Sequence, residues 1–397
     1  MMGTFMQQVA LGYLVYNLTG SKWLLGTISA LQLGPSLFLS LPAGVVADRV
    51  QRKRLVMCTQ SVALLLSFTL ATLIALHRLQ IWEILVISTI SGIAIATEGP
   101  ARQAFVVDLV GREDLPNAIA WNSLIVNGAR VIGPAIGGIA IRFVGIPPIF
   151  YYNSFSFLVM ILTLLAMGPI ATPRTTARNP FAEAREGLAY VRNSPAIMLI
   201  LAMLFVVATF ALNYAVLMPI LARDLLHTSA DGLGWMWTAF GVGAVIGSFT
   251  VVSRSEAAVR GPLLLTASLV AGGSELAMAA ARTMPVMLAL LVLVGWGTGA
   301  FVASANSAVQ ARVHDAVRGR VLSVYAMIFA GTAPVGGLLA AWLASLGGAP
   351  LSLAVNGGIC TITSLALAMP FLRTLRGTVG PARVSTIEAD RSVAKQA

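Results

Sequence analysis

The stretch NAIAWNSLIVNGARVIGPAIGGIAI, residues 117–141, decides the fold class of this chain. It is mainly apolar and rich in small residues, with Arg130 near its middle and the segment GPAIGG directly after. The core of a water-soluble domain rarely has this composition. A membrane-spanning helix does, because small residues let helices approach closely and Pro is tolerated where neighbours satisfy the freed carbonyl group. An ionisable residue at such a depth is a functional candidate.

The composition of the whole chain also indicates a membrane protein. Of its 397 residues 57% are hydrophobic and 10% are charged, whereas soluble domains have about 25% charged residues. Eleven apolar runs come near the length of about 20 residues that crosses the hydrocarbon, and one shorter run stands at the start. The runs are residues 1–18, 23–47, 55–76, 82–97, 118–141, 149–167, 195–217, 232–252, 262–281, 284–309, 321–346 and 351–372. We expect an all-α membrane protein whose first helix is incomplete, in a chain that begins downstream of the true start or is a fragment.

The basic residues predict the orientation. Twenty of the 26 Lys and Arg residues lie in the loops of one side and five in the loops of the other, with Arg130 inside a run. Because cytoplasmic loops carry the excess of Lys and Arg, the first side and the C-terminus are expected in the cytoplasm, as in a multi-pass protein of the cell inner (plasma) membrane. The net charge of +11 then needs no nucleic-acid partner to explain it.

The two halves of the chain have related sequences. Pro134 and Pro334 stand 200 residues apart in similar Gly-rich segments, and each follows a basic, Asp-containing loop. We expect a six-helix bundle at 1–167, a cytoplasmic linker at 168–194 with an amphipathic helix over 179–192, a second bundle at 195–372 and a tail at 373–397. Repeated halves indicate a transporter built around a pseudo-two-fold axis, and we expect a monomer.

The loop GVVADRVQRKR, residues 44–54, has two interpretations. Its basic residues could serve only to fix orientation in the membrane. Alternatively, Asp48 could cap the N-terminus of a neighbouring helix while Arg49 and Arg52 bind acidic groups on another loop, in contacts that exist only when the cytoplasmic mouth is shut.

This loop resembles the signature loop of the major facilitator superfamily, Gly-x3-Asp-Arg-x-Gly-Arg-Arg/Lys. The residues Gly133, Pro134, Gly137 and Gly138 are similar to the end of the antiporter signature in the fifth span. Residues 3–21 and 115–123 resemble the transmembrane secretion effector branch, which includes enterobactin-type siderophore exporters. The resemblance covers essentially the whole chain and implies the major facilitator fold of two six-helix bundles.

The resemblance also implies roles for single residues. Asp48 and Arg49 would latch the two halves on the inside against the start of the eleventh span near Val321, with Asp108 as an acidic partner. Some residues depart from the signatures: Gln51, Ala120 and Ala129 stand where glycines are expected. The fourth span, residues 82–97, also lacks the proton-linked Arg of known drug antiporters, so the coupling route stays open.

Arg130 has two interpretations. As a structural group it could bond to carbonyl groups freed by Pro134. As a functional group it could hold an anionic substrate or sense the protonation of a carboxylate. The repeat favours function, because Pro334 has Ala330 where Pro134 has Arg130.

Other polar residues of the runs are candidates for coupling or for lining a cavity. Glu98 lies near the cytoplasmic end of the fourth run, where it could take part in mouth gating or proton exchange, and Glu275, in the ninth run, is expected to have a structural role in the outer leaflet. The first, fourth, seventh and tenth helices line the cavity in this fold. Candidates on them, each of which could instead be an interhelical hydrogen-bond donor, are Gln8, Asn213, Tyr214, Asn306 and Gln310.

No catalytic, metal or cofactor site is expected. The three His residues are scattered without metal-ligand spacing, and the Gly-rich segments lie inside apolar runs rather than after strands. We expect a proton-coupled exporter of a small amphipathic molecule, drug-like or siderophore-like, in the lipid bilayer. An importer or facilitator of the same fold, or a non-transporting membrane sensor or scaffold, remains the alternative.

Overall fold

The computed structural model describes residues 1–110, 114–168, 180–253, 257–314 and 317–376, and its regular elements are helices. They are α1 (Met2–Thr19), α2 (Lys22–Arg49), α3 (Arg52–Ala75), α4 (Ile81–Val110), α5 (Leu115–Val144), α6 (Pro147–Ala166), α7 (Pro180–Arg192), α8 (Pro195–Phe210), α9 (Tyr214–Ile220), the π-helix η1 (Leu221–Leu225), α10 (Ala230–Val252), α11 (Ala257–Met278), α12 (Met284–Arg312) and α13 (Arg318–Arg376).

Glycines end or divide the helices where the chain must turn. Gly20 ends α1 with φ 63° and Gly145 ends α5 with φ 80°, a left-handed backbone that glycine adopts without steric cost. Gly347 and Gly348 interrupt α13, so this 59-residue element is two helices that meet at a sharp turn. The seventh apolar run is interrupted too, because α8 ends at Phe210 and α9 starts at Tyr214.

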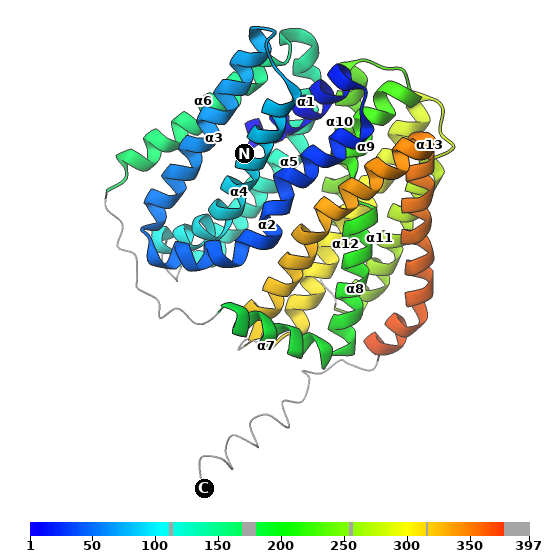
Figure 1. The fold of residues 1–397 in the computed structure, drawn as a ribbon. Coiled ribbons are helices and arrows are strands. Elements are labelled where there is room, and N and C mark those ends of the chain that lie inside the picture. Colours follow the sequence, from blue (N-terminus) through cyan, green and yellow to red (C-terminus); the bar gives the residue numbers. More distant parts are fainter. Residues whose placement is uncertain (111–113, 169–179, 254–256, 315–316, 377–397) are drawn as a thin grey trace.

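The expected all-α membrane fold of two six-helix bundles is confirmed (Figure 1). The first half consists of α1 to α6. The second consists of α8, α9 and η1 as one interrupted span, then α10, α11, α12 and the two helices of α13, while α7 lies between the halves in sequence. In the described part, eight segments are long and apolar enough to cross a membrane, with α13 counted once.

Within the described part of the chain, the more extensive contacts between the halves are those of α2 with α13, α5 with α10, α1 with α9, and α2 with α9. One hydrophobic cluster runs through both halves at one end of the molecule, from Val15 of α1 and Ile28 of α2 to Leu217 of α9 and Ala341 of α13. We call this the joined end.

At the other end, where α7 lies and which we call the linker end, the buried clusters are separate. One cluster, which includes Val191 of α7, Ile197 of α8 and Phe301 of α12, belongs to the second half. A smaller one, around Val56 and Phe105, belongs to the first half. The halves therefore share a core at the joined end and have separate cores at the linker end.

Candidate functional site

A group of charged and aromatic side chains fastens the halves at the joined end. The Tyr16 hydroxyl group of α1 donates a hydrogen bond of 2.5 Å to Asp224 Oδ2 of η1, and Lys22 Nζ of α2 lies 3.0 Å from the same oxygen. Arg223 donates to the main-chain carbonyl oxygen of Tyr16, and its guanidinium carbon lies 5.1 Å from the centroid of the Tyr16 ring. We call these four residues the closing cluster. Its bonds are charge-assisted and therefore stronger than neutral hydrogen bonds.

A second ion pair crosses between the halves nearby. Arg142 lies in the last turn of α5 and Asp231 in the first turn of α10, and the two side chains form a close ion pair. Each charge also suits its helix end, because a C-terminus attracts cations and an N-terminus attracts anions. The Arg142 side chain is 61% exposed, so this pair contributes less than the closing cluster.

Glycines let helices of opposite halves touch backbone to backbone. A Cβ atom on Gly138 of α5 would collide with the Cα atom of Gly234 of α10 and lie 2.6 Å from its nitrogen. On the other pair of helices, a Cβ atom on Gly26 of α2 would lie 2.5 Å from the Ala341 Cβ atom and 3.1 Å from the Gly337 carbonyl oxygen of α13. Any side chain at these positions would push the halves apart.

The rest of the antiporter-like segment faces α1. A Cβ atom on Gly133 would lie 2.8 Å from the Phe5 Cβ atom, and one on Gly137 would lie 2.9 Å from the Met6 Cα atom. Pro134 is buried between them within α5. The segment therefore seats α5 against α1 on one side and, through Gly138, against the second half.

At the linker end the structure brings two of the predicted gating residues together. Arg52 Nη1 of α3 donates to both carboxylate oxygens of Asp108 of α4, at 2.7 and 2.9 Å, and both side chains are almost fully buried. This ion pair joins two helices of the same half, and it is formed while the cores of the halves are separate at this end, so the expectation that such a contact exists only in the shut state does not hold for Arg52. Asp48 and Arg49 stand at the end of α2, but their side chains lie outside the described part of the chain.

Glu98 of α4 is held by neighbours from the first half. Gln60 Nε2 of α3 donates to Glu98 Oε1 over 2.8 Å, and Arg102 Nη1, one turn further along α4, lies 3.6 Å from the same oxygen. The Glu98 side chain is mostly buried. A carboxyl group between an amide donor and a guanidinium group can exchange a proton without being left unpaired.

Arg130 lies halfway along α5 with an exposed side chain. Its guanidinium carbon is 5.9 Å from the centroid of the Phe5 ring of α1, within the range of a cation–π interaction. Gln8, also exposed, follows Phe5 by about one turn and lies on the same side of α1. Among the described residues no carbonyl oxygen accepts from Arg130, so the bond that the structural interpretation requires near Pro134 is not formed.

Asn213 and Tyr214 stand at the interruption between α8 and α9, and both are buried inside the second half. The Asn213 Nδ2 group donates to the Thr209 carbonyl oxygen over 2.6 Å and packs beside Gly336 of α13. The Tyr214 ring lies 5.0 Å from the Phe240 ring, between centroids. Neither residue presents a polar group to an open passage in this conformation.

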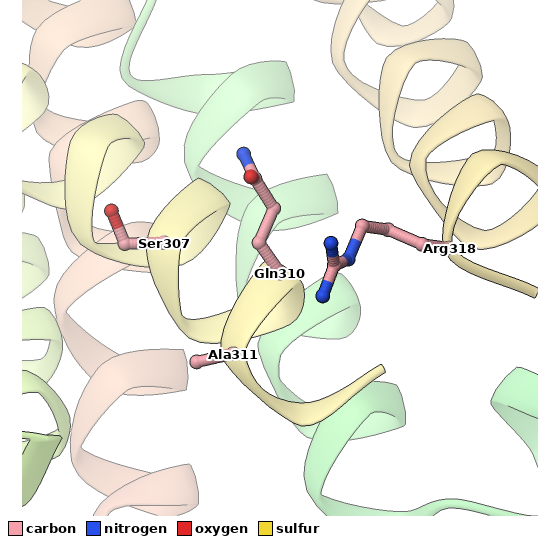
Figure 2. A pocket seen from close by; sticks show the side chains of 4 residues that line it. All are labelled: Ser307, Gln310, Ala311 and Arg318. Atoms are coloured by element: carbon pink, nitrogen blue, oxygen red, sulfur yellow. The ribbon is translucent and has the colours of Figure 1, made fainter. Parts of the chain in front are cut away.

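Asn306 and Gln310 lie one turn apart on α12 and are hydrogen-bonded to each other. Gln310 lines a hollow of about 330 Å³ together with Ser307, Ala311 and Arg318. Figure 2 shows Arg318 extending from the start of α13 toward α12, beside Gln310. The hollow offers amide, hydroxyl and guanidinium groups at the linker end. Among the described residues, no three His, Cys, Asp or Glu side chains gather closely enough to hold a metal ion.

Sequence reasoning missed the closing cluster. Tyr16 and Asp224 are 208 residues apart, and Lys22 resembles an ordinary interfacial residue. The one available signal was the charged dipeptide Arg223-Asp224 directly after a long apolar run.

Comparison with known proteins identifies a family. The family described as transmembrane secretion effector matches residues 1–380. A staphyloferrin A transporter of Staphylococcus aureus (strain NCTC 8325 / PS 47) is 24% identical over 372 residues, covering 93% of this chain and 92% of that protein. The enterobactin exporter EntS of Shigella boydii serotype 4 (strain Sb227) is 28% identical over 325 residues, covering 79% of this chain and 75% of that protein.

Two solved structures have the same fold. A bacterial homologue of the human lysosomal transporter Spinster, in an inward-facing and unoccupied conformation, matches with a TM-score of 0.75 and 14% identity, over 96% of both chains. The nucleoside transporter NupG matches with a TM-score of 0.69 and 13% identity, over 94% of this chain and 98% of that chain. At these identities the likeness shows the fold alone.

Proposed function

Because this chain belongs to the transmembrane secretion effector family of the major facilitator superfamily, we propose that it exports a small amphipathic molecule, drug-like or siderophore-like, by alternating access coupled to protons. It is a multi-pass membrane transporter of a small molecule. The observation that carries the proposal is the unequal joining of the halves, which share a core at the joined end and have separate cores at the linker end. Such a molecule is closed on one side and loads from the other.

The direction of loading follows from the basic loops. If the linker end lies in the cytoplasm, as the excess of Lys and Arg there indicates, the described conformation accepts its solute from the cytoplasm. We place the protein in the bacterial inner membrane as a monomer, with bundles at 1–167 and 195–372, the linker at 168–194 and a cytoplasmic tail at 373–397. The enterobactin exporter among its relatives supports export.

The proposed substrate contact is the pair of Arg130 and Phe5 with Gln8 beside it. A guanidinium group next to an aromatic ring suits a ligand with an anionic group and an apolar body. The polar hollow at Gln310 lies at the linker end and would receive the ligand first. Asn213 and Tyr214, buried at the helix interruption, would act through helix movement rather than by direct contact.

The proposed gates lie at both ends. At the linker end, Asp48 and Arg49 would latch the halves when that mouth shuts, supported by the buried pair of Arg52 and Asp108. At the joined end, the closing cluster would break when the outer mouth opens. Glu98, hydrogen-bonded to Gln60 and beside Arg102, is a proposed site of proton exchange.

Transport in energised inverted membrane vesicles tests the proposal, with enterobactin and staphyloferrin A as the first probes. An exporter accumulates solute inside such vesicles, and a proton-coupled one loses the accumulation when an uncoupler is added. An importer accumulates solute only in right-side-out vesicles, and a facilitator equilibrates solute regardless of the uncoupler. If no solute moves in either direction across a broad ligand panel, the protein is a sensor or scaffold and the exporter proposal fails.

A further inference from the structure

Glu275 of α11 is buried without a partner. The residue is 0% exposed, and neither of its carboxyl oxygens has a hydrogen-bond partner among the described groups. Buried polar groups are almost always hydrogen-bonded, and each exception needs an explanation. An ionised carboxylate in this position would be strongly unfavourable, because nothing replaces the water it has lost.

The backbone at Glu275 packs directly against α13. A Cβ atom on Gly357 of α13 would lie 2.5 Å from the Leu276 nitrogen and 3.0 Å from the Glu275 carbonyl carbon, so the two backbones are in direct contact. Asn356, the residue before Gly357 on α13, is also fully buried, and its Oδ1 atom has no hydrogen-bond partner among the described groups.

Tyr214 of α9 is a candidate to complete this site. Its hydroxyl group is buried and has no partner among the described groups, and Met278, one turn after Glu275 on α11, belongs to the same hydrophobic cluster as Tyr214. Tyr214 is the first residue after the interruption between α8 and α9. The same short segment continues into η1, which carries Arg223 and Asp224 of the closing cluster. A movement of η1 therefore acts on the segment and the hydrophobic cluster to which Tyr214 belongs.

Few charged or titratable groups surround Glu275. α11 packs against α12 and α13, and Cys360 of α13 lies beside Gly272 of α11, about one turn before Glu275. Arg282, in the loop after α11, donates to the carbonyl oxygens of Ala279 and Ala281 instead. Arg312 and Arg318 stand at the far ends of α12 and α13.

We propose that Glu275 is a proton-binding site, which holds its proton as the neutral acid while the closing cluster is intact and releases it to water when that cluster opens. On release, the O–H bond of the carboxyl group breaks, the proton passes to a water molecule, and the Tyr214 hydroxyl group donates to the carboxylate that remains. The proposal rests on the proposed function, in which protons are exchanged for solute, and it adds a proton-binding site in the second half to the one proposed at Glu98 in the first.

Infrared difference spectroscopy of the full chain in lipid nanodiscs tests the protonation state without any substrate. The spectrum of the wild type minus that of Glu275→Gln is expected to show the carbonyl band of a neutral acid. Glu83→Gln is the matched control, because Glu83 lies in the first turn of α4, where its carboxylate accepts from the Gln80 main-chain nitrogen at an exposed site, and should give a carboxylate band. An ionised band for Glu275 would overturn the proposal.

Transfer of the protein into D2O tests release of the proton. The acid band should shift as deuterium replaces the proton, and about tenfold faster in Asp224→Asn, which loses charge-assisted bonds of the closing cluster. Tyr214→Phe should slow the exchange, since the carboxylate then lacks its donor. An acid band that never shifts would overturn the proposal, and this can be read in the wild type even if a variant fails to fold.

The outcome is separable from that of the proposed function. An ionised Glu275 in a protein that still exports solute would refute only the proton site. A neutral, exchanging Glu275 in a protein that moves no solute would leave the site standing and refute the exporter.

Discussion

Weakening the closing cluster should shift the protein toward a state that is open at the joined end. Asp224→Asn keeps the shape of the side chain and its ability to accept from Tyr16, but it removes the negative charge. The hydrogen bond from Tyr16 then changes from charge-assisted to neutral, a loss of about 1 kcal/mol. The partly exposed ion pair with Lys22 contributes about 0.5 kcal/mol more. The sum of about 1.5 kcal/mol corresponds to about tenfold in the ratio of closed to open molecules.

Amide hydrogen exchange, followed by mass spectrometry in nanodiscs, measures this ratio. Backbone amides at residues 11–20 and 214–226 exchange when the joined end opens, and their exchange rate is proportional to the population of open molecules. We expect these peptides to exchange about tenfold faster in Asp224→Asn, while residues 157–166, in the part of α6 that reaches the linker end, keep their rate.

Two further variants rank the contacts. Asp231→Asn removes the pair with the exposed Arg142, and its effect should stay below about fivefold, because exposed pairs contribute less than about 1 kcal/mol. Glu83→Gln removes a carboxylate that bonds only within its own half and should change nothing. If Asp224→Asn leaves amide hydrogen exchange at the joined end unchanged, or if Asp231→Asn has the larger effect, the closing cluster does not hold the halves together.

Three other predictions concern the helix contacts and the central charge. Gly138→Val should destabilise the closed molecule by about 1–3 kcal/mol in thermal unfolding, because its side chain would overlap the facing backbone. Gly128→Ala on the same helix is the control: its Cβ atom would have no neighbour within 4 Å, so the change should be neutral or stabilising. Arg52→Gln should cost about 3–5 kcal/mol by leaving Asp108 buried without its partner, and an Arg52→Met/Asp108→Leu double variant should recover part of that loss in the same measurement. Arg130→Ala should abolish vesicle transport while leaving the melting temperature largely intact, and a folded, fully active variant would return Arg130 to a structural role.

The sequence was sufficient for the fold because each membrane helix is recognisable from its own residues. Apolar length and small-residue content are local properties, so the segment from Gly133 to Gly138 could be assigned to a packing surface before its neighbours were known. The distribution of basic residues likewise predicts orientation without any contact information. The family match over residues 1–380 agrees with the predicted fold.

The side-chain contacts between the halves could not be predicted from the sequence. Asp224 binds Tyr16 across the molecule, and no spacing rule relates two residues so far apart. The side chains at the helix interruption were also unpredictable, because an irregular segment changes which direction the next residue faces. Asn213 and Tyr214 were expected to line a cavity because they lie in the seventh apolar run, whereas both are buried within the second half. Glu275 was expected to be structural, but its burial without a partner is visible only in three dimensions.

The paired glycine contacts between the halves have a mechanical consequence. Gly138 of α5 meets the backbone of Gly234 of α10, and Gly26 of α2 meets the Ala341 Cβ atom and the Gly337 carbonyl oxygen of α13. Where only glycines and small side chains separate two helices, the helices can turn against each other without displacing large side chains. A transport cycle in this protein would then include a rotation of the halves about these two contacts.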